Sequence, residues 1–161
     1  GALSLRLFFP KRSFAADVGL LGGAELIAYP NDIFTDIYTE QVHKNGKCEL
    51  YIVTNGITAV QQSRFGGCAL APYFDKCFIS EQMGCAKPEK KFFDLVAASI
   101  PNFDPKEALV IGDSLSSDIR GGINAGLDTC WFNPKGKAAP ADMEITYTVG
   151  RLADIEAILL G

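Results

Sequence analysis

Long apolar runs are missing from the 161-residue sequence, and histidine occurs only once, as His43. No run approaches the roughly 18 apolar residues that a membrane-crossing helix needs, so we expect no membrane partner. Lys and Arg do not cluster outside Lys87–Lys91, and the net charge is −4. This argues against a nucleic-acid surface, because phosphate contacts need grouped cations. A lone histidine near a predicted helix end is typical of a surface residue, so no histidine-based mechanism is expected.

Paired cysteines are also missing. The odd set of five contains no C-x-x-C and consists of Cys48, Cys68, Cys77, Cys85 and Cys130. This pattern argues against both a disulfide framework and a zinc site. The first residues, GALSLRLFF, carry Arg6 inside their apolar stretch, which is not typical of a signal peptide. We therefore expect free thiols and a cytoplasmic protein.

From about residue 30 onward, helical and strand-like patterns alternate. Helices are predicted over residues 30–46, 57–64, 88–100, 116–126 and 152–160, and strands over 48–54, 76–80, 108–112, 128–132 and 145–149. Strands joined by such helices imply right-handed crossovers between parallel strands. The sequence therefore predicts an α/β fold, a Rossmann-like parallel sheet with helices on both faces. In such sheets ligands bind at the carboxyl ends of the strands.

Two of these strand ends carry groups suited to a phosphate. Thr54 ends one strand, and the amides of Asn55 and Gly56 follow it where a helix begins. Unpaired N–H groups and the helix dipole favour an anion there. Lys87 precedes a predicted helix that starts at Pro88, and its charge suits the same anion. Taken singly, a threonine at a strand end is more often a helix cap, and a lysine before a proline is more often a solvated surface residue.

Two carboxylates follow the strand ALVIG. Asp113 comes directly after the strand, where a buried acid needs a compensating cation, and Asp118 lies in the next helix. Asp118 alone could be a first-turn acid favoured by the helix dipole. Carboxylates are hard oxygen ligands that Mg²⁺ prefers. An anion cradle, a lysine and an acidic metal site together predict phosphoryl-transfer chemistry.

Three segments carry a family resemblance. IVTNG, GCAKPEKKFF and VIGDSLSSDIRGGINAGLDTCWFN resemble the second, third and fourth motifs of the haloacid dehalogenase-like (HAD) hydrolases. QQSRF, YFDKCFISEQMG and AGLDTCWFNP are similar to the branch of pyrimidine 5′-nucleotidase-like phosphatases. The resemblance covers residues 30–161 and implies a HAD-like Rossmannoid core. It also implies a Mg²⁺-dependent phosphatase acting on a small phosphomonoester, such as a nucleoside monophosphate.

The resemblance assigns roles within the phosphate site. The hydroxyl of Thr54 would hold the phosphate, Asn55 and Gly56 would add backbone contacts, and Lys87 would bridge phosphate and nucleophile.

It assigns roles around the metal as well. Asp113 would ligate Mg²⁺ directly, Asp118 would act through water, and Ser114 would touch the waters of the metal. We further expect Lys87 to be the counter-charge of Asp113. The glycines of the following helix would keep it slim where it packs on the sheet (Gly121 and Gly122) and end it (Gly126).

The first motif of the family, Asp-x-Asp-x-Thr after the first strand, is not found in these 161 residues. Two interpretations of residues 1–29 follow. In the first, which we prefer, they are a remnant of the family's helical cap, and the fold is incomplete at its N-terminus. In the second, LSLRLFF is a degenerate first strand, with Pro10 and Arg12 in place of the two aspartates. Without a nucleophile, covalent transfer has no first step.

Three functional hypotheses therefore stand side by side. The first is a phosphatase, and the second is a catalytically inactive domain or pseudoenzyme that binds phosphate and Mg²⁺. The third is an incomplete sheet whose unpaired edges self-associate. The sequence leaves the exact substrate and the oligomeric state open.

Overall fold

The computed structural model describes residues 5–9, 48–66, 74–151 and 153–160. The predicted helix over residues 30–46, the single histidine, Pro10 and Arg12 lie outside these ranges. None of the helices in the described part is long and apolar enough to cross a membrane.

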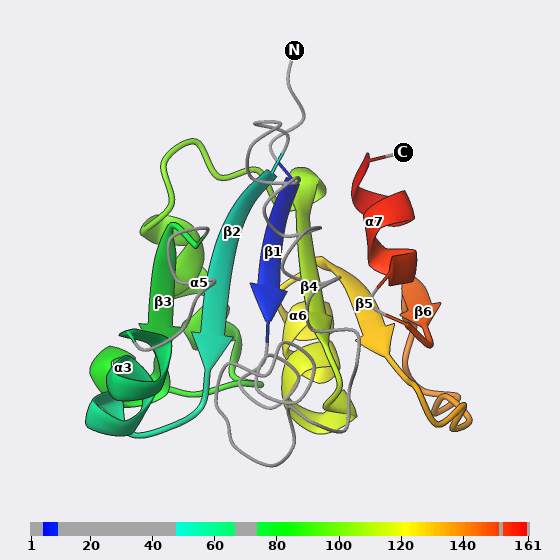
Figure 1. Ribbon diagram of the computed structural model, residues 1–161, viewed down its shortest axis with the longest axis horizontal. Coiled ribbons are helices and arrows are strands. Elements are labelled where there is room, and N and C mark those ends of the chain that lie inside the picture. Colours follow the sequence, from blue (N-terminus) through cyan, green and yellow to red (C-terminus); the bar gives the residue numbers. More distant parts are fainter. Residues whose placement is uncertain (1–4, 10–47, 67–73, 152, 161) are drawn as a thin grey trace.

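Six parallel strands form one sheet in the order β3-β2-β1-β4-β5-β6 (Figure 1). The strands are β1 (Leu5–Phe9), β2 (Cys48–Thr54), β3 (Lys76–Ile79), β4 (Ala108–Gly112), β5 (Asp128–Phe132) and β6 (Tyr147–Val149). The predicted parallel sheet and the five strands expected after residue 47 are confirmed. Since all strands run the same way, their carboxyl ends meet at one edge.

Strand β1 lies at the centre of the sheet, between β2 and β4. Residues 5–9 are therefore strand rather than cap helix, as in the second interpretation, and they fill the position that the first left empty. The physical reason is that an extended segment at this position pairs its backbone groups on both sides. The remaining residues of 1–29, and the boundary at residue 29, stay predictions because residues 10–47 are not described.

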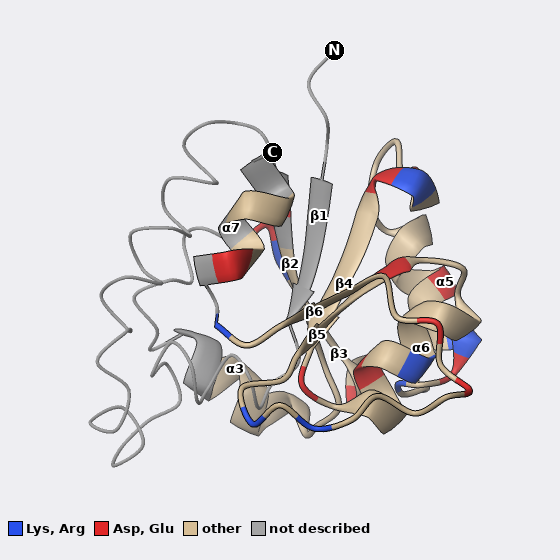
Figure 2. Cartoon of the chain, turned by 90° about the vertical axis from the view of Figure 1, so that its right-hand side faces the viewer, with Lys and Arg blue, Asp and Glu red and all other residues tan. Residues whose placement is uncertain are grey.

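Helices cover both faces of the sheet, as predicted. They are α3 (Thr58–Gly66), α4 (Ser80–Met83), α5 (Lys90–Ala98), α6 (Arg120–Asn124) and α7 (Ala153–Leu160), with a 3₁₀ turn η3 (Pro105–Glu107) and a π-helical turn η4 (Leu115–Ile119). In the edge-on view of Figure 2, α5 and α6 lie on one side of the sheet and α3 and α7 on the other.

Two details of the helices differ from the prediction. The short helix α4 was not expected, and α5 begins at Lys90 rather than at Pro88.

A buried apolar layer between the sheet and α5 supports the strands that carry the site. Every residue of β4 is buried, and α5 buries Phe92, Phe93 and Val96 on one face. Val96 follows Phe93 by three positions and Phe92 by four, which is the spacing of one helix face. Phe92 and Phe93 meet edge to face, with ring centroids 5.5 Å apart. This packing fixes where β4 ends, and so where Asp113 lies.

Two glycines let α6 approach its neighbours closely. A Cβ at Gly122 would lie 2.7 Å from Thr129 Cγ2, on the sheet, and one at Gly121 would lie 2.5 Å from Phe93 Cε2, on α5. The predicted slim helix is confirmed for Gly122, whereas Gly121 faces α5 instead of the sheet. Gly126 follows the helix with φ +72°, which confirms it as the helix stop.

Candidate active site

A buried ion pair joins Lys87 to Asp118 at the carboxyl edge of the sheet. Lys87 Nζ lies 2.6 Å from Asp118 Oδ1, and the two side chains are 3% and 1% exposed. Lys87 Nζ also donates to the Val53 carbonyl at 3.1 Å. Burial raises the pKa of the Asp118 carboxyl above its ordinary value, although the Lys87 ammonium opposes this. The expectation that Lys87 is the counter-charge of Asp113 is corrected here, because the carboxylate at bonding distance is that of Asp118.

The backbone of Lys87 is held by the side chain of Asn55. Asn55 Nδ2 donates to the Lys87 carbonyl at 2.9 Å, and the Lys87 amide donates to Asn55 Oδ1 at 3.0 Å. These two bonds join the end of β2 to the connection between α4 and α5. The sequence assigned only the Asn55 backbone to the site. Its side chain has the further role of placing the lysine beside the strand end.

The turn after β2 differs from the open anion site that the sequence predicted. The Gly56 amide donates to Ser80 Oγ at 3.0 Å, and the Thr58 amide donates to Glu81 Oε2 at 2.5 Å. The Thr58 amide lowers the pKa of the Glu81 carboxyl. Residues of α4 therefore already cap the start of α3. At this turn the Thr54 hydroxyl stays free, because Thr54 Oγ1 is buried with no hydrogen-bond partner among the described residues.

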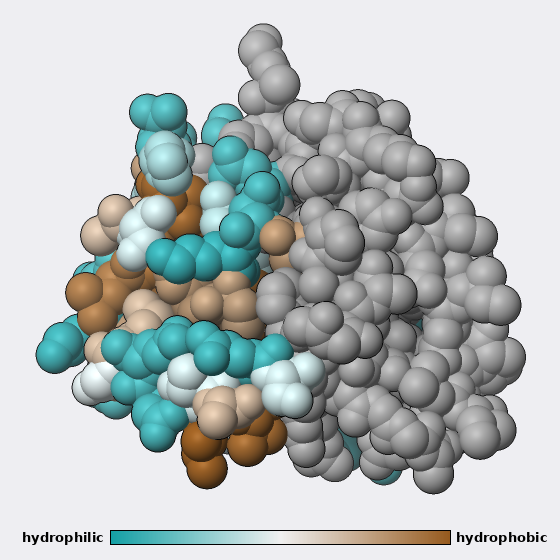
Figure 3. Space-filling model, turned by 60° about the vertical axis from the view of Figure 1, so that its left-hand side comes forward, coloured by the Kyte–Doolittle hydropathy of each residue, from teal (hydrophilic) through white to brown (hydrophobic). Residues whose placement is uncertain are grey.

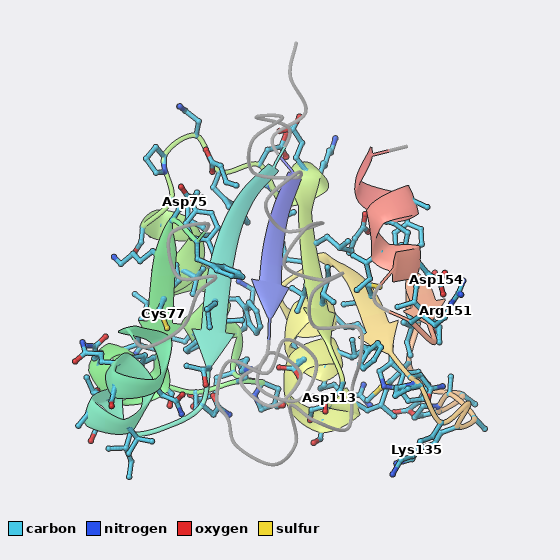
Figure 4. The ribbon with its side chains drawn as sticks, in the orientation of Figure 1. Asp75, Cys77, Asp113, Lys135, Arg151 and Asp154 are labelled. Carbon is cyan, nitrogen blue, oxygen red and sulfur yellow. The ribbon has the colours of Figure 1, made fainter. Side chains whose placement is uncertain are left out.

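Asp113 follows β4 at the same edge of the sheet, as Figure 4 shows. Its Oδ1 is buried and has no hydrogen-bond partner among the described residues. Its backbone is fixed, because the indole N–H of Trp131 on β5 donates to the Asp113 carbonyl at 3.2 Å. Asp113 thus presents an unpaired carboxylate oxygen on a held backbone, which is the predicted property of a cation ligand.

The wide turn η4 brings Asp118 back toward the strand end. The amides of Asp118 and Ile119 both donate to the Ser114 carbonyl, at 3.0 and 3.1 Å. Asp118 Oδ2 accepts the Ser114 amide at 3.2 Å. The Ser114 hydroxyl accepts the Ser117 amide at 3.3 Å, so it caps this turn. Gly112 leaves room for the fold-back, since a Cβ there would lie 2.5 Å from Asp118 Cβ.

The oxygen atoms at this edge of the sheet are suitable ligands for Mg²⁺. That ion takes one or two carboxylates and completes its shell with water and substrate phosphate. Among the described residues, Asp113 Oδ1 is a carboxylate oxygen that is free to bind a metal ion, whereas both oxygens of Asp118 already accept hydrogen bonds. In the described ranges, no group of three or more His, Cys, Asp or Glu residues could hold a metal ion by itself. The arrangement therefore suits a water-rich magnesium site more than a closed zinc site.

The sequence missed three contributors to this edge: Gln61, Ser80 and Trp131. Ser80 and Trp131 act through contacts between segments distant in sequence, which no local pattern reveals. Gln61 is a polar residue in a predicted helix, and only the structure shows that it is buried, with 4% of its surface exposed.

The chain belongs to the haloacid dehalogenase-like hydrolases, because the model of that family matches residues 38–126. This range contains the seven candidate residues Thr54, Asn55, Gly56, Lys87, Asp113, Ser114 and Asp118.

Two curated relatives are pyrimidine 5′-nucleotidases. YjjG of Escherichia coli is 44% identical over 114 residues, which are 71% of this chain and 51% of that protein. PynA of Streptococcus pneumoniae is 43% identical over 107 residues, which are 66% of this chain and 45% of that protein. The chain thus spans about half the length of the curated relatives it matches.

Solved structures share the fold. The HAD-hydrolase YfnB of Bacillus subtilis, in a crystal structure bound to magnesium, superposes with a TM-score of 0.73. The match covers 97% of this chain and 98% of that chain at 25% identity. A HAD phosphatase from Thermococcus onnurineus superposes with a TM-score of 0.67 at 30% identity, over 81% of this chain and 57% of that chain.

Proposed function

We propose that this protein is a Mg²⁺-dependent phosphomonoesterase that hydrolyses pyrimidine nucleoside 5′-monophosphates. The observation that carries the proposal is a pair of buried oxygens, Thr54 Oγ1 and Asp113 Oδ1, that have no hydrogen-bond partner among the described residues. They lie at the carboxyl ends of β2 and β4, on the two sides of β1 and at the edge of the sheet where Lys87 pairs with Asp118. One is a hydroxyl that can donate to a phosphate, and the other is a carboxylate oxygen that can bind a cation. A bound phosphate and Mg²⁺ would satisfy both.

Lys87 supplies the positive charge for the phosphate. Its ammonium has three N–H bonds, of which Val53 O and Asp118 Oδ1 accept two. The third can donate to a phosphate oxygen. Asp118 and the Asn55 side chain keep the ammonium in place, so that it need not reorganise when the phosphate binds.

Asp113 would hold Mg²⁺, and Asp118 and Ser114 would contact its water ligands. Bound Mg²⁺ would neutralise charge on the transferring phosphoryl group. The nucleotide specificity is proposed from the relatives, since YjjG and PynA are pyrimidine 5′-nucleotidases. A cytoplasmic location is proposed too, supported by the free thiols of Cys77, Cys85 and Cys130.

The test is release of inorganic phosphate by the full gene product that contains this chain. With Mg²⁺ present, we expect release from UMP and dUMP, and loss of the activity when EDTA removes the metal. Asp113→Asn should lower phosphate release at least about a hundredfold, because it replaces the one carboxylate of the site that has an unpaired buried oxygen among the described residues. Asp128→Asn is the matched control, since Asp128 is exposed at the opposite end of β5 and should leave the rate unchanged.

A second candidate is a domain that binds phosphate and Mg²⁺ without turnover. It is favoured by one observation, namely that no Asp-x-Asp occurs in the 161 residues. In that case ³¹P NMR should detect Mg²⁺-dependent binding of inorganic phosphate, while no nucleotide releases phosphate. Turnover that disappears in Asp113→Asn would exclude this second candidate, and absence of both turnover and binding would contradict both.

A further inference from the structure

The start of α3 exposes apolar residues and buries a polar one. Ile57 is 60% exposed and Val60 is 40% exposed, whereas Gln61 is only 4% exposed. Figure 3 brings this side of the molecule forward, and hydrophobic surface is visible at the lower edge of the described part. Within residues 57–63, Gln61 is the one buried residue. A helix that served only to pack on the sheet would place an apolar side chain there.

The side-chain amide of Gln61 is a buried polar group at the start of α3. Its Nε2 has no hydrogen-bond partner among the described residues. A buried amide donor left unpaired is unfavourable, and such a group in a folded protein has a water or a ligand as its partner. The Nε2–H₂ group of Gln61 is therefore available to donate a hydrogen bond to a ligand, and leaving it unpaired lowers the stability of the fold.

The position of this amide points to the proposed phosphate site. A Cβ at Gly56 would contact Gln61 Nε2 and would lie 3.1 Å from its Cδ. The Gln61 amide thus lies directly against the turn that follows Thr54. In the part of the chain that the structure describes, Thr54 Oγ1 is also buried without a hydrogen-bond partner. Two backbone donors of this turn are already used, because the Gly56 amide donates to Ser80 and the Thr58 amide donates to Glu81.

We propose that Gln61 is a substrate-binding residue whose Nε2 donates a hydrogen bond to an oxygen of the phosphate bound at Thr54. This inference rests on the proposed function, because it names a further donor at the same site. Gln61 takes the place that the sequence had assigned to the Gly56 amide. It binds the anion as a neutral donor and adds no charge beside the Lys87–Asp118 pair.

The test compares two adjacent glutamines of α3. Gln61→Glu replaces the donor by a carboxylate, Gln61→Met removes it at similar size, and Gln62→Glu adds the same charge at an exposed position. Inorganic phosphate with Mg²⁺ is the probe, and binding is measured by calorimetry. We expect Gln61→Glu to weaken phosphate binding at least about tenfold and Gln61→Met about three- to tenfold, with no more than a twofold change in Gln62→Glu.

Side-chain NMR gives a readout that a merely structural role would not move. The Nε2–H₂ signals of Gln61, assigned by their absence in Gln61→Met, should shift on addition of phosphate, whereas those of Gln62 should stay in place. Gln61→Met also keeps the test valid if the buried carboxylate of Gln61→Glu prevents folding.

Thr54→Val, which removes the proposed phosphate hydroxyl, separates the two proposals. If it weakens phosphate binding while folded Gln61 variants bind as tightly as wild type, the inference about Gln61 is overturned and the proposed function stands. If wild type binds no phosphate at all, the proposed function fails and the role of Gln61 fails with it.

Discussion

At the scale of single residues, burial decides what an ion pair does for the fold. Lys87 and Asp118 lie 2.6 Å apart with side chains 3% and 1% exposed, whereas Lys90 and Asp94 lie 2.8 Å apart with side chains 61% and 55% exposed. The contact distances are similar. An exposed pair contributes little because water screens it, but a buried charge that loses its partner is strongly unfavourable.

Replacing Lys87 should therefore be far more destabilising than replacing Lys90. We expect Lys87→Met to lower the free energy of unfolding by about 3–5 kcal/mol, because it leaves the Asp118 carboxylate buried and unpaired. Lys90→Met, the matched control, should change it by no more than about 1 kcal/mol. Urea unfolding of the two variants measures the difference.

The double variant identifies the cause. Adding Asp118→Asn to Lys87→Met removes the unpaired charge, so part of the lost stability should return. Equal costs for Lys87→Met and Lys90→Met, or no recovery in the double variant, would contradict the role assigned to the buried pair.

At the scale of elements, the close packing of α6 sets the geometry of the metal side. Gly122 lies against Val110 of β4 and Thr129 of β5, and the turn η4 that carries Asp118 leads directly into α6. A helix held further from the sheet would move η4 with it. Gly122 thus helps to set the position of Asp118 although it takes no part in the chemistry of the site.

Gly122→Ala tests this packing. Its Cβ would lie 2.7 Å from Thr129 Cγ2 and 3.2 Å from Val110 Cβ, so we expect a loss of about 1–3 kcal/mol in unfolding free energy. Gly150→Ala is the control, because a Cβ there meets nothing within 4 Å. Thermal and urea unfolding provide the comparison, and equal stability of the two variants would show that α6 can move away from the sheet at little cost.

At the scale of the whole molecule, the parallel sheet brings together groups from distant parts of the sequence. Thr54 lies at the end of β2, Asp113 at the end of β4, and Trp131 reaches from β5 to the Asp113 carbonyl. Trp131 is the single tryptophan of the sequence. Its indole therefore reports on the Asp113 backbone without interference from other tryptophans.

Binding of Mg²⁺ at Asp113 should change the signal of Trp131. We expect the indole N–H resonance to shift during a Mg²⁺ titration, because its acceptor is the carbonyl of the proposed ligand residue. Asp113→Asn should abolish or greatly weaken the response, and Asp128→Asn should keep it. If calorimetry detects Mg²⁺ binding while Asp113→Asn responds like wild type, the metal lies elsewhere.

The sequence by itself determined the order of the strands and of the longer helices after residue 47, and the residue types at two strand ends. Apolar runs such as ALVIG, alternating with helical spacing, depend on neighbours close in sequence, and these predicted β4, α5 and the parallel sheet correctly. The segment LSLRLFF was ambiguous for the same reason. Its short apolar run suits a strand or a helix, and only pairing with β2 and β4 makes it β1.

Tertiary structure alone decided which groups of the site already have a hydrogen-bond or ion-pair partner and which do not. The Asn55 side chain hydrogen-bonds to the backbone of Lys87, and Ser80 Oγ accepts the Gly56 amide. Asp118, rather than Asp113, forms the ion pair with Lys87. Each of these contacts joins residues at least 24 positions apart. A hydrogen bond depends on distances of a few tenths of an ångström between such segments, and only the packed sheet and its helices set those distances.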